Sequence, residues 1–237
     1  ADRGQSWSEV EVLPFPPCAS YEISFGILVT PSGRWLAPAA TLPAADRLGE
    51  RVLLLPSDDG GRTWGEPVTA FRDPEGRHGF FEHKFACLPD GRLLGICWTV
   101  TLGDVEDREN HYVISEDDGA TWSDPQSTGI RGQTMCPLPL DDRHALLLYN
   151  RRYGRQAIVA VVADISRDPW ALGPERLLYD AGESRERPDG VSGVAEFDAF
   201  AFGFPTARFL PDGSILATYW SKADGRFGVR WARLGLQ

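Results

Sequence analysis

The sequence lacks the features that define several large classes of protein. No apolar run approaches the roughly 18–20 residues of a membrane-spanning helix, so we expect no membrane span. No segment keeps apolar residues at helical spacing over three turns, and we therefore expect an all-β structure. Basic residues are few, with 24 Lys and Arg against 34 Asp and Glu. This acidic balance argues against nucleic acid as a general partner.

The cysteines show no metal or redox pattern. They form no C-x-x-C pair and none stands near a histidine at zinc-ligand spacing; the four are Cys18, Cys87, Cys97 and Cys136. Each lies in or beside an apolar run, which is typical of a small buried hydrophobic side chain. We expect no metal site and no cofactor.

The chain does contain an internal repeat. Ser57–Trp64 and Ser115–Trp122 both read S-x-D-x-G-x-T-W, and a truncated copy ends at Trp7. In each copy the aspartate carboxylate can accept backbone N–H groups inside a tight turn, and the glycine supplies a positive φ. The tryptophan supplies a large apolar side chain for a neighbouring sheet. We interpret these segments, named the repeat turns below, as parts of the fold without a chemical role, including Asp59 and Asp117.

Hairpin turns lie between the repeat turns. They share a proline near the centre of a short polar segment between apolar runs, at Thr30–Arg34, Leu88–Arg92, Leu138–Asp142 and Leu210–Ser214. The repeating unit therefore reads strand, hairpin, strand, loop, strand, repeat turn, strand. Such an antiparallel meander of about 50–58 residues matches one blade of a β-propeller.

The blades can be placed along the chain. We predict three complete four-stranded blades and then a fourth without its outer strand, over 24–71, 81–130, 133–179 and 202–234. Glu9–Leu13 is predicted to be the outer strand of a preceding blade. The polar segment Asp180–Val194 is predicted to be a surface loop, and the acidic cluster Asp104–Glu109 is predicted to be a solvated loop.

The repeat turns resemble the Asp boxes of the sialidase superfamily, and most of the chain is similar to bacterial BNR-repeat proteins of sialidase type. The other segments that carry this likeness are Phe81–Lys84, Gly132–Thr134, Tyr149–Tyr153 and Glu196–Phe200. The resemblance implies a six-bladed β-propeller, of which residues 1–237 would form a single partial domain of about four blades, with the N-terminal blades missing. It implies a bacterial protein and leaves open whether the protein is cytoplasmic or exported.

The resemblance also implies a site on the propeller axis, at the face opposite the Asp boxes. Residues at the start of each innermost strand, and at the end of its hairpin partner, point there. The predicted catalytic residues are Glu22, Glu82, Asp198 and Tyr153. The predicted substrate-binding residues are Arg131, Gln133, Arg151, Arg152, His83, Lys84 and Trp220. In sialidases an arginine triad binds the substrate carboxylate, a Tyr–Glu pair is the nucleophile, and an aspartate is the acid or base.

Two classes of function remain open on this sequence. The first is a glycoside hydrolase that acts on a glycan, with exo-α-sialidase as one form. The second is a non-catalytic propeller that binds carbohydrate or protein. The arginine-bearing F-R-I-P segment of sialidases does not occur in this sequence. Converging arginines and a Tyr–Glu pair on the axis would favour catalysis, and a flat or apolar axis would favour binding.

Overall fold

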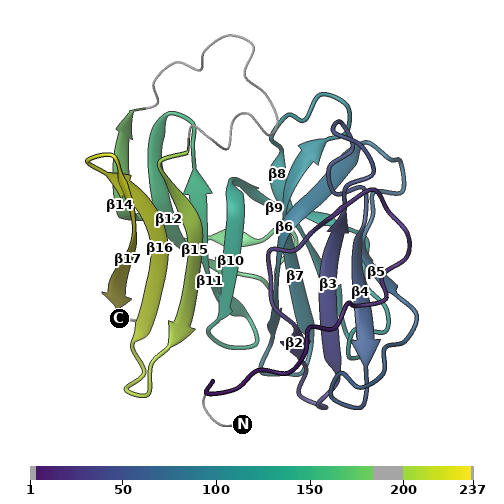
Figure 1. Cartoon of the computed structure of the whole chain (residues 1–237). Coiled ribbons are helices and arrows are strands. Elements are labelled where there is room, and N and C mark those ends of the chain that lie inside the picture. The colour runs from purple at the N-terminus through teal and green to yellow at the C-terminus, as the bar shows by residue number, and fades with distance from the viewer. Residues whose placement is uncertain (1–3, 184–199, 236–237) are drawn as a thin grey trace.

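The computed structural model describes residues 4–183 and 200–235, and within these ranges every regular element is a β-strand. Four antiparallel sheets stand side by side as the blades of a β-propeller (Figure 1). Each blade is a meander in which successive strands pair, except that β1 and β2 both pair with β3, and β13 and β14 both pair with β12. No described helix is long and apolar enough to cross a membrane. The prediction of an all-β propeller is confirmed, whereas a total of six blades stays a prediction.

The blades follow one another along the chain. The first blade contains β1 (Tyr21–Glu22), β2 (Leu28–Val29), β3 (Trp35–Thr41), β4 (Val52–Ser57) and β5 (Val68–Phe71). The second contains β6 (His78–Cys87), β7 (Leu93–Thr101), β8 (Glu109–Ser115) and β9 (Gln126–Arg131). The third contains β10 (Gln133–Pro139), β11 (His144–Arg151), β12 (Arg155–Asp164), β13 (Ala171–Leu172) and β14 (Arg176–Glu183). The fourth contains β15 (Phe202–Phe209), β16 (Ile215–Ala223) and β17 (Arg226–Leu234). Three complete blades and a fourth with three strands agree with the prediction.

The hydrophobic core lies between neighbouring blades. Leu36 of the first blade belongs to one cluster with Phe80 of the second. Ile96 of the second blade belongs to another cluster with Leu147 of the third, and the third and fourth blades share a cluster around Ile215. Because β3, β7 and β11 are covered on both faces, their sequences are nearly continuous apolar runs. This packing brings the innermost strands of successive blades together along one axis.

The repeat turns are held by their own aspartates. Asp117 accepts a hydrogen bond from the backbone N–H of Thr121 at 2.8 Å and another from the Thr121 hydroxyl at 2.5 Å. Asp59 makes the same pair of bonds in the first blade. A Cβ atom on Gly119, whose φ is 81°, would lie 2.5 Å from Leu36 of the preceding blade. The aspartates hold their turns as predicted, and the turn also packs two blades together; that they have no chemical role stays a prediction.

The predicted strand at Glu9–Leu13 is wrong. This segment has no regular structure, and Val10 is 92% exposed. A strand needs a neighbour for its backbone N–H and C=O groups. No strand in residues 4–183 or 200–235 pairs with this segment.

The innermost strand of the first blade is interrupted. β1 and β2 both pair with β3, and residues 23–27 between them leave the ladder. Ser24 in this gap binds the second blade instead, because its hydroxyl donates to the carbonyl of His83 at 3.2 Å. The carbonyl of Ser24 in turn accepts a hydrogen bond from Nζ of Lys84. The sequence predicts that the strand before the hairpin starts at Ser24. In the structure its regular part starts at Leu28 instead.

Candidate functional site

The innermost strands are irregular toward the end of the axis opposite the hairpins. The pairing register of β6, β10 and β15 shifts, and each shift includes a non-glycine residue with positive φ: Glu82 at 48°, Thr134 at 31° and Phe204 at 53°. Such bulges re-aim side chains and are frequent next to active sites. A left-handed conformation at a non-glycine residue costs on the order of 1–3 kcal/mol. Its repetition in three blades marks this end of the axis as the candidate site.

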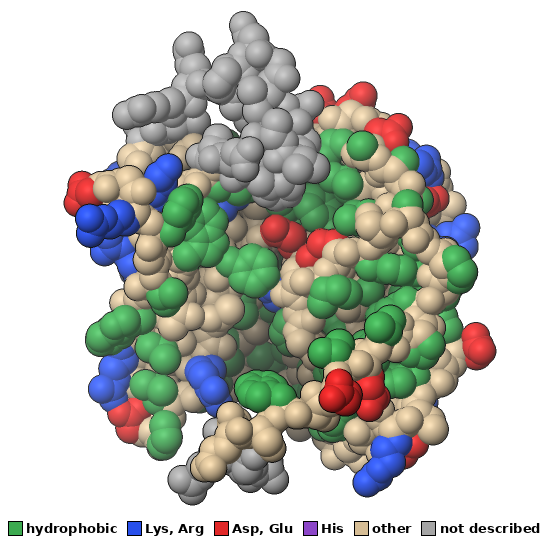
Figure 2. Space-filling view, viewed as in Figure 1, with side chains coloured by type: hydrophobic (Ala, Val, Ile, Leu, Met, Phe, Trp, Pro, Cys, Tyr) green, Lys and Arg blue, Asp and Glu red, His purple; other side chains and the backbone are tan. Residues whose placement is uncertain are grey.

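Two glutamates from different blades meet there. The Oε2 atom of Glu22, on β1, accepts a hydrogen bond from the backbone N–H of Glu82, on β6, at 3.0 Å. The Oε2 atom of Glu82 is buried and has no hydrogen-bond partner among the described residues. Burial, together with the negative charge of Glu22, raises the pKa of Glu82 to about 7. Burial also raises the pKa of Glu22, although hydrogen bonds from Ser24 and Glu82 oppose this shift. Figure 2 shows acidic side chains reaching the surface near the middle of the face it draws.

Lys84 bridges the first and fourth blades across the axis. Its side chain is almost fully buried, and its Nζ atom donates to the carbonyl of Ser24. The same nitrogen lies 3.7 Å from the ring centroid of Phe204 on β15. Burial lowers the pKa of Lys84, and the nearby carboxylates of Glu82 and Glu22 oppose that shift. The axis is therefore occupied by a cation with both glutamates close by.

His83 is buried beside Glu22. Its Nδ1 atom lies 3.6 Å from Oε2 of Glu22, which is too far for a hydrogen bond. Neither ring nitrogen has a hydrogen-bond partner among the described residues. Burial, and then the positive charge of Lys84, lower the pKa of His83 to about 3. The imidazole is therefore neutral at physiological pH.

A chain of hydrogen bonds joins the third blade to the second. Nη1 of Arg152 donates to Oε1 of Gln133 at 2.9 Å, and Nε2 of Gln133 donates to Oδ2 of Asp107 at 3.0 Å. The other carboxylate oxygen of Asp107 accepts a hydrogen bond from Nε1 of Trp98 at 2.8 Å. The guanidinium carbon of Arg152 lies 3.3 Å from the ring centroid of Phe200. The charges of Arg152 and Asp107 both influence the pKa of Glu82. These hydrogen-bonded residues therefore lie beside the glutamate pair.

A groove opens next to this chain on the second blade. It encloses about 720 Å³, and its lining includes Asp107, His78, His111 and Arg131. Asp107 belongs both to the groove and to the hydrogen-bonded chain. The groove and the axial cluster are therefore neighbours.

The axial cluster unites part of the predicted site: Glu22, Glu82, His83, Lys84, Gln133 and Arg152. Asp198 lies outside the described residues, so its predicted role as an acid or base stays a prediction.

Other predicted site residues make contacts away from the glutamate pair. Nη1 of Arg151 lies 2.6 Å from Oε2 of Glu175 in an ion pair. The hydroxyl of Tyr153 donates to the carbonyl of Arg131, and the Arg131 guanidinium carbon lies 4.8 Å from the tyrosine ring centroid. Trp220 lies on β16, opposite the irregular part of β15. The Tyr153 hydroxyl is thus bonded to a carbonyl rather than to the glutamate that a sialidase nucleophile requires.

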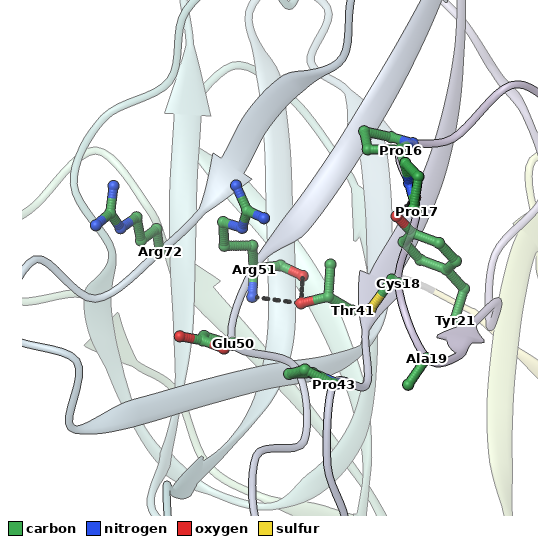
Figure 3. Close-up of a pocket in the computed structure, with 10 residues that line it drawn as sticks. All are labelled: Pro16, Pro17, Cys18, Ala19, Tyr21, Thr41, Pro43, Glu50, Arg51 and Arg72. Carbon is green, nitrogen blue, oxygen red and sulfur yellow. Dashed lines mark hydrogen bonds between the residues drawn. The ribbon is translucent and has the colours of Figure 1, made fainter.

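A second cavity, of about 370 Å³, lies beside β1 (Figure 3). The hydroxyl of Tyr21, in its lining, donates to the carbonyl of Pro16 at 2.5 Å. Thr41 and Arg51 are joined by two hydrogen bonds, of 3.1 and 3.3 Å, drawn in Figure 3. None of the predicted catalytic or substrate-binding residues that the structure describes lines this cavity. We therefore place the candidate site at the axis and not here.

Comparisons with known proteins bear on the fold. No protein-family model and no curated protein matches the sequence. Among solved structures, the chain is similar to a protein of unknown function from Dyadobacter fermentans DSM 18053. That match has 23% identity and a TM-score of 0.72, and it covers 100% of this chain and 62% of that one.

Two enzymes are similar in structure. The NanB sialidase of Streptococcus pneumoniae matches with 18% identity and a TM-score of 0.62, over 98% of this chain and 34% of that one. The α-L-arabinofuranosidase Arb93A of Fusarium graminearum matches with 15% identity and a TM-score of 0.64, over 88% and 61%. The fold is that of a sialidase-type β-propeller. The chain spans less than two thirds of the length of each of these three structures.

Three residues of the axial cluster are not predicted from the sequence: Ser24, Asp107 and Phe204. The prediction that the acidic cluster at 104–109 is merely solvated is wrong for Asp107, because its carboxylate binds Gln133 and Trp98. The sequence offers one signal for Asp107. It lies in the loop after the second strand of a blade, and that loop faces the same end of the axis as Glu82. Four other charged residues share the segment 104–109, so nothing in the sequence separates Asp107 from them.

Proposed function

We propose that this propeller is a glycoside hydrolase that uses Glu82 as its general acid and Glu22 as the ionised carboxylate beside it. The observation that carries the proposal is the contact between these two glutamates from different blades. Glycoside hydrolysis uses a pair of carboxyl groups whose environments separate their pKa values. Burial raises the pKa of Glu82 to about 7. Burial raises the pKa of Glu22 as well, and hydrogen bonds from Ser24 and the Glu82 backbone oppose that rise.

Five residues of the axial cluster have roles in this mechanism. Glu82 donates its proton to the glycosidic oxygen as the bond to the leaving group breaks, and a water molecule then adds to the anomeric carbon and returns a proton to Glu82. Glu22 places negative charge beside the sugar ring, where positive charge develops in the transition state. Arg152 and Gln133 bind hydroxyl groups of the sugar. Lys84 limits the pKa of the acid, because its positive charge favours ionised Glu82.

A second form of the proposal is an exo-α-sialidase. The Asp-box pattern of the repeat turns and the similarity to the NanB sialidase favour it. In this form Arg152 binds the substrate carboxylate, Tyr153 is the nucleophile and Asp198 is the acid. His83 and Trp220 complete the substrate-binding set. The similarity to Arb93A instead favours a neutral pentose as the sugar that is released.

The experiment compares hydrolysis of two fluorogenic substrates, 4-methylumbelliferyl α-sialoside and 4-methylumbelliferyl α-L-arabinofuranoside. We expect one of them to be cleaved, and Glu82→Gln to lower kcat by about 10²–10⁴-fold, the usual contribution of a general acid. Glu116→Gln is the matched control, because Glu116 is exposed on a repeat turn at the opposite end of the molecule. Activity that survives Glu82→Gln would contradict the assignment.

The experiment also separates the enzyme from a binding module. If neither substrate is cleaved but glycans bind the wild-type chain, the protein is a non-catalytic propeller that binds carbohydrate. Cleavage of the sialoside alone would select the sialidase form. Cleavage of the arabinofuranoside alone would select the neutral pentose.

A further inference from the structure

The groove on the second blade has the size of a ligand site. Its volume of about 720 Å³ falls within the roughly 300–1,000 Å³ of small-molecule pockets. Strand ends and one loop form it: His78 begins β6, His111 lies on β8, Ser127 lies on β9 and Arg131 ends β9. Because these groups stand on strands of one sheet, their positions are set by the blade.

Two imidazole rings lie together in the lining. The ring centroids of His78 and His111 are 5.6 Å apart. Nδ1 of His78 lies 2.9 Å from the carboxylate of Asp73, and Nδ1 of His111 lies 2.9 Å from the carbonyl of Glu109. Since both Nδ1 atoms face acceptors, they carry the proton in the neutral rings, and each Nε2 atom is left as an acceptor. No group in the described part of the chain binds either Nε2 atom.

The other groups of the lining are mostly acceptors too. They include the carboxylates of Glu106, Asp107 and Glu109 and the guanidinium groups of Arg108 and Arg131. Arg108 is paired with Glu106 at 3.1 Å. The carboxylates of the lining outnumber its guanidinium groups, so the groove has an excess of negative charge. An anionic group would be repelled there. A neutral sugar suits the lining, because its hydroxyl protons match the carboxylate and imidazole acceptors.

The groove is joined to the axial cluster through one residue. Oδ2 of Asp107, in the lining, accepts the hydrogen bond from Gln133, which in turn accepts one from Arg152. We infer that the groove is a second subsite, which binds a neutral sugar of the same glycan whose glycosidic bond lies at the glutamate pair. The substrate is then an oligosaccharide with a neutral sugar on the leaving-group side. This inference rests on the proposed glycoside hydrolase function.

The test fills the groove. Ser127→Trp places a bulky ring in it, and His111→Phe keeps a ring while removing the Nε2 acceptor. The control is Glu116→Trp at the repeat-turn end. The probes are 3′-sialyllactose and arabinotriose, each compared with the 4-methylumbelliferyl glycoside of its terminal sugar. We expect both groove variants to lower kcat/KM for the oligosaccharide at least about tenfold more than for the aryl glycoside, as the loss of one good hydrogen bond does.

The outcomes distinguish the inference from the function on which it rests. Equal losses for long and short substrates, with hydrolysis still dependent on Glu82, would overturn the subsite and leave the function standing. If no glycoside is cleaved, the function fails, and the groove is judged by calorimetry with arabinotriose and lactose. An affinity for these sugars about tenfold lower in Ser127→Trp than in the wild type would support the sugar site. No binding of the sugars to the wild-type chain would overturn it.

Discussion

Glu22 binds the backbone N–H of Glu82, and the two residues belong to different blades. The N–H group in this bond is that of the bulged residue itself, whose φ is 48°. A carboxylate from the first blade therefore stabilises the local conformation that carries the proposed acid on the second. The same contact therefore joins the two blades and places a negative charge beside the proposed acid.

Replacing Glu22 should change the acidity of Glu82. Glu22→Gln keeps an oxygen that can accept the backbone N–H but removes the negative charge. Because that charge raises the pKa of Glu82, the pKa should fall below about 7 while burial still holds it above its ordinary value. The basic limb of the pH profile of kcat/KM should move to lower pH. Carbon-13 NMR titration of the Glu82 carboxyl gives the same quantity without activity, and Glu116→Gln is expected to leave both readouts unchanged.

Replacing Lys84 should have the opposite effect. Lys84→Met keeps an apolar stem of similar length and removes the positive charge that favours ionised Glu82. The pKa of Glu82 should therefore rise above about 7, and the basic limb should move to higher pH. A shift in the same direction as that of Glu22→Gln would show that Lys84 does not act on Glu82 through its charge.

The fold should be less stable above neutral pH because of Glu82. Its pKa in the folded state is about 7, above the ordinary 4.5 expected for the unfolded chain. Its favourable contribution is therefore fully present below pH 4.5 and is lost as the pH rises through 7. The loss is on the order of 2–3 kcal/mol in the free energy of unfolding. Urea unfolding at pH 5 and pH 8 should show this difference in the wild type and a smaller one in Glu82→Gln.

The place of Arg152 can be tested through Gly203. A Cβ atom on Gly203 would lie 2.4 Å from Nη2 of Arg152, so Gly203→Ala must displace the guanidinium group. We expect KM to rise about tenfold, the effect of losing one hydrogen bond to a ligand. Gly228→Ala is the matched control, because a Cβ atom there meets no atom within 4 Å. An unchanged KM would mean that Arg152 does not contact the substrate.

The repeat turns should matter for stability alone. Asp117→Ala removes the acceptor of two hydrogen bonds from Thr121, and we expect a loss of about 1 kcal/mol in the free energy of unfolding. The Thr121 hydroxyl is the main cause that lowers the pKa of Asp117 below its ordinary 3.8. This stabilisation is therefore present above pH 3.8 and is lost as the pH falls further. Glu116→Ala is the control in urea unfolding, and a changed kcat/KM in folded Asp117→Ala would contradict a purely structural role.

The architecture was largely predictable because its signals are local. Asp59 and Asp117 accept hydrogen bonds from threonines four residues away, so their turns form from one short segment. The hairpins and the alternating apolar strands are equally short-range, and they were sufficient to place four blades. Glu9–Leu13 shows the limit, since its pattern suits a strand but a strand also requires a partner.

The sequence by itself determined the blades, their turns and the candidate residues at the ends of the innermost strands. Only the tertiary structure decided which of those residues meet. Glu22 reaches Glu82 because two blades pack at a particular height, and Lys84 spans to the fourth blade for the same reason. Arg151, chosen by the same rule as Arg152, pairs with Glu175 instead. Adjacent residues on a strand face opposite ways, so the packing of the neighbouring blade decides which arginine turns toward the axis.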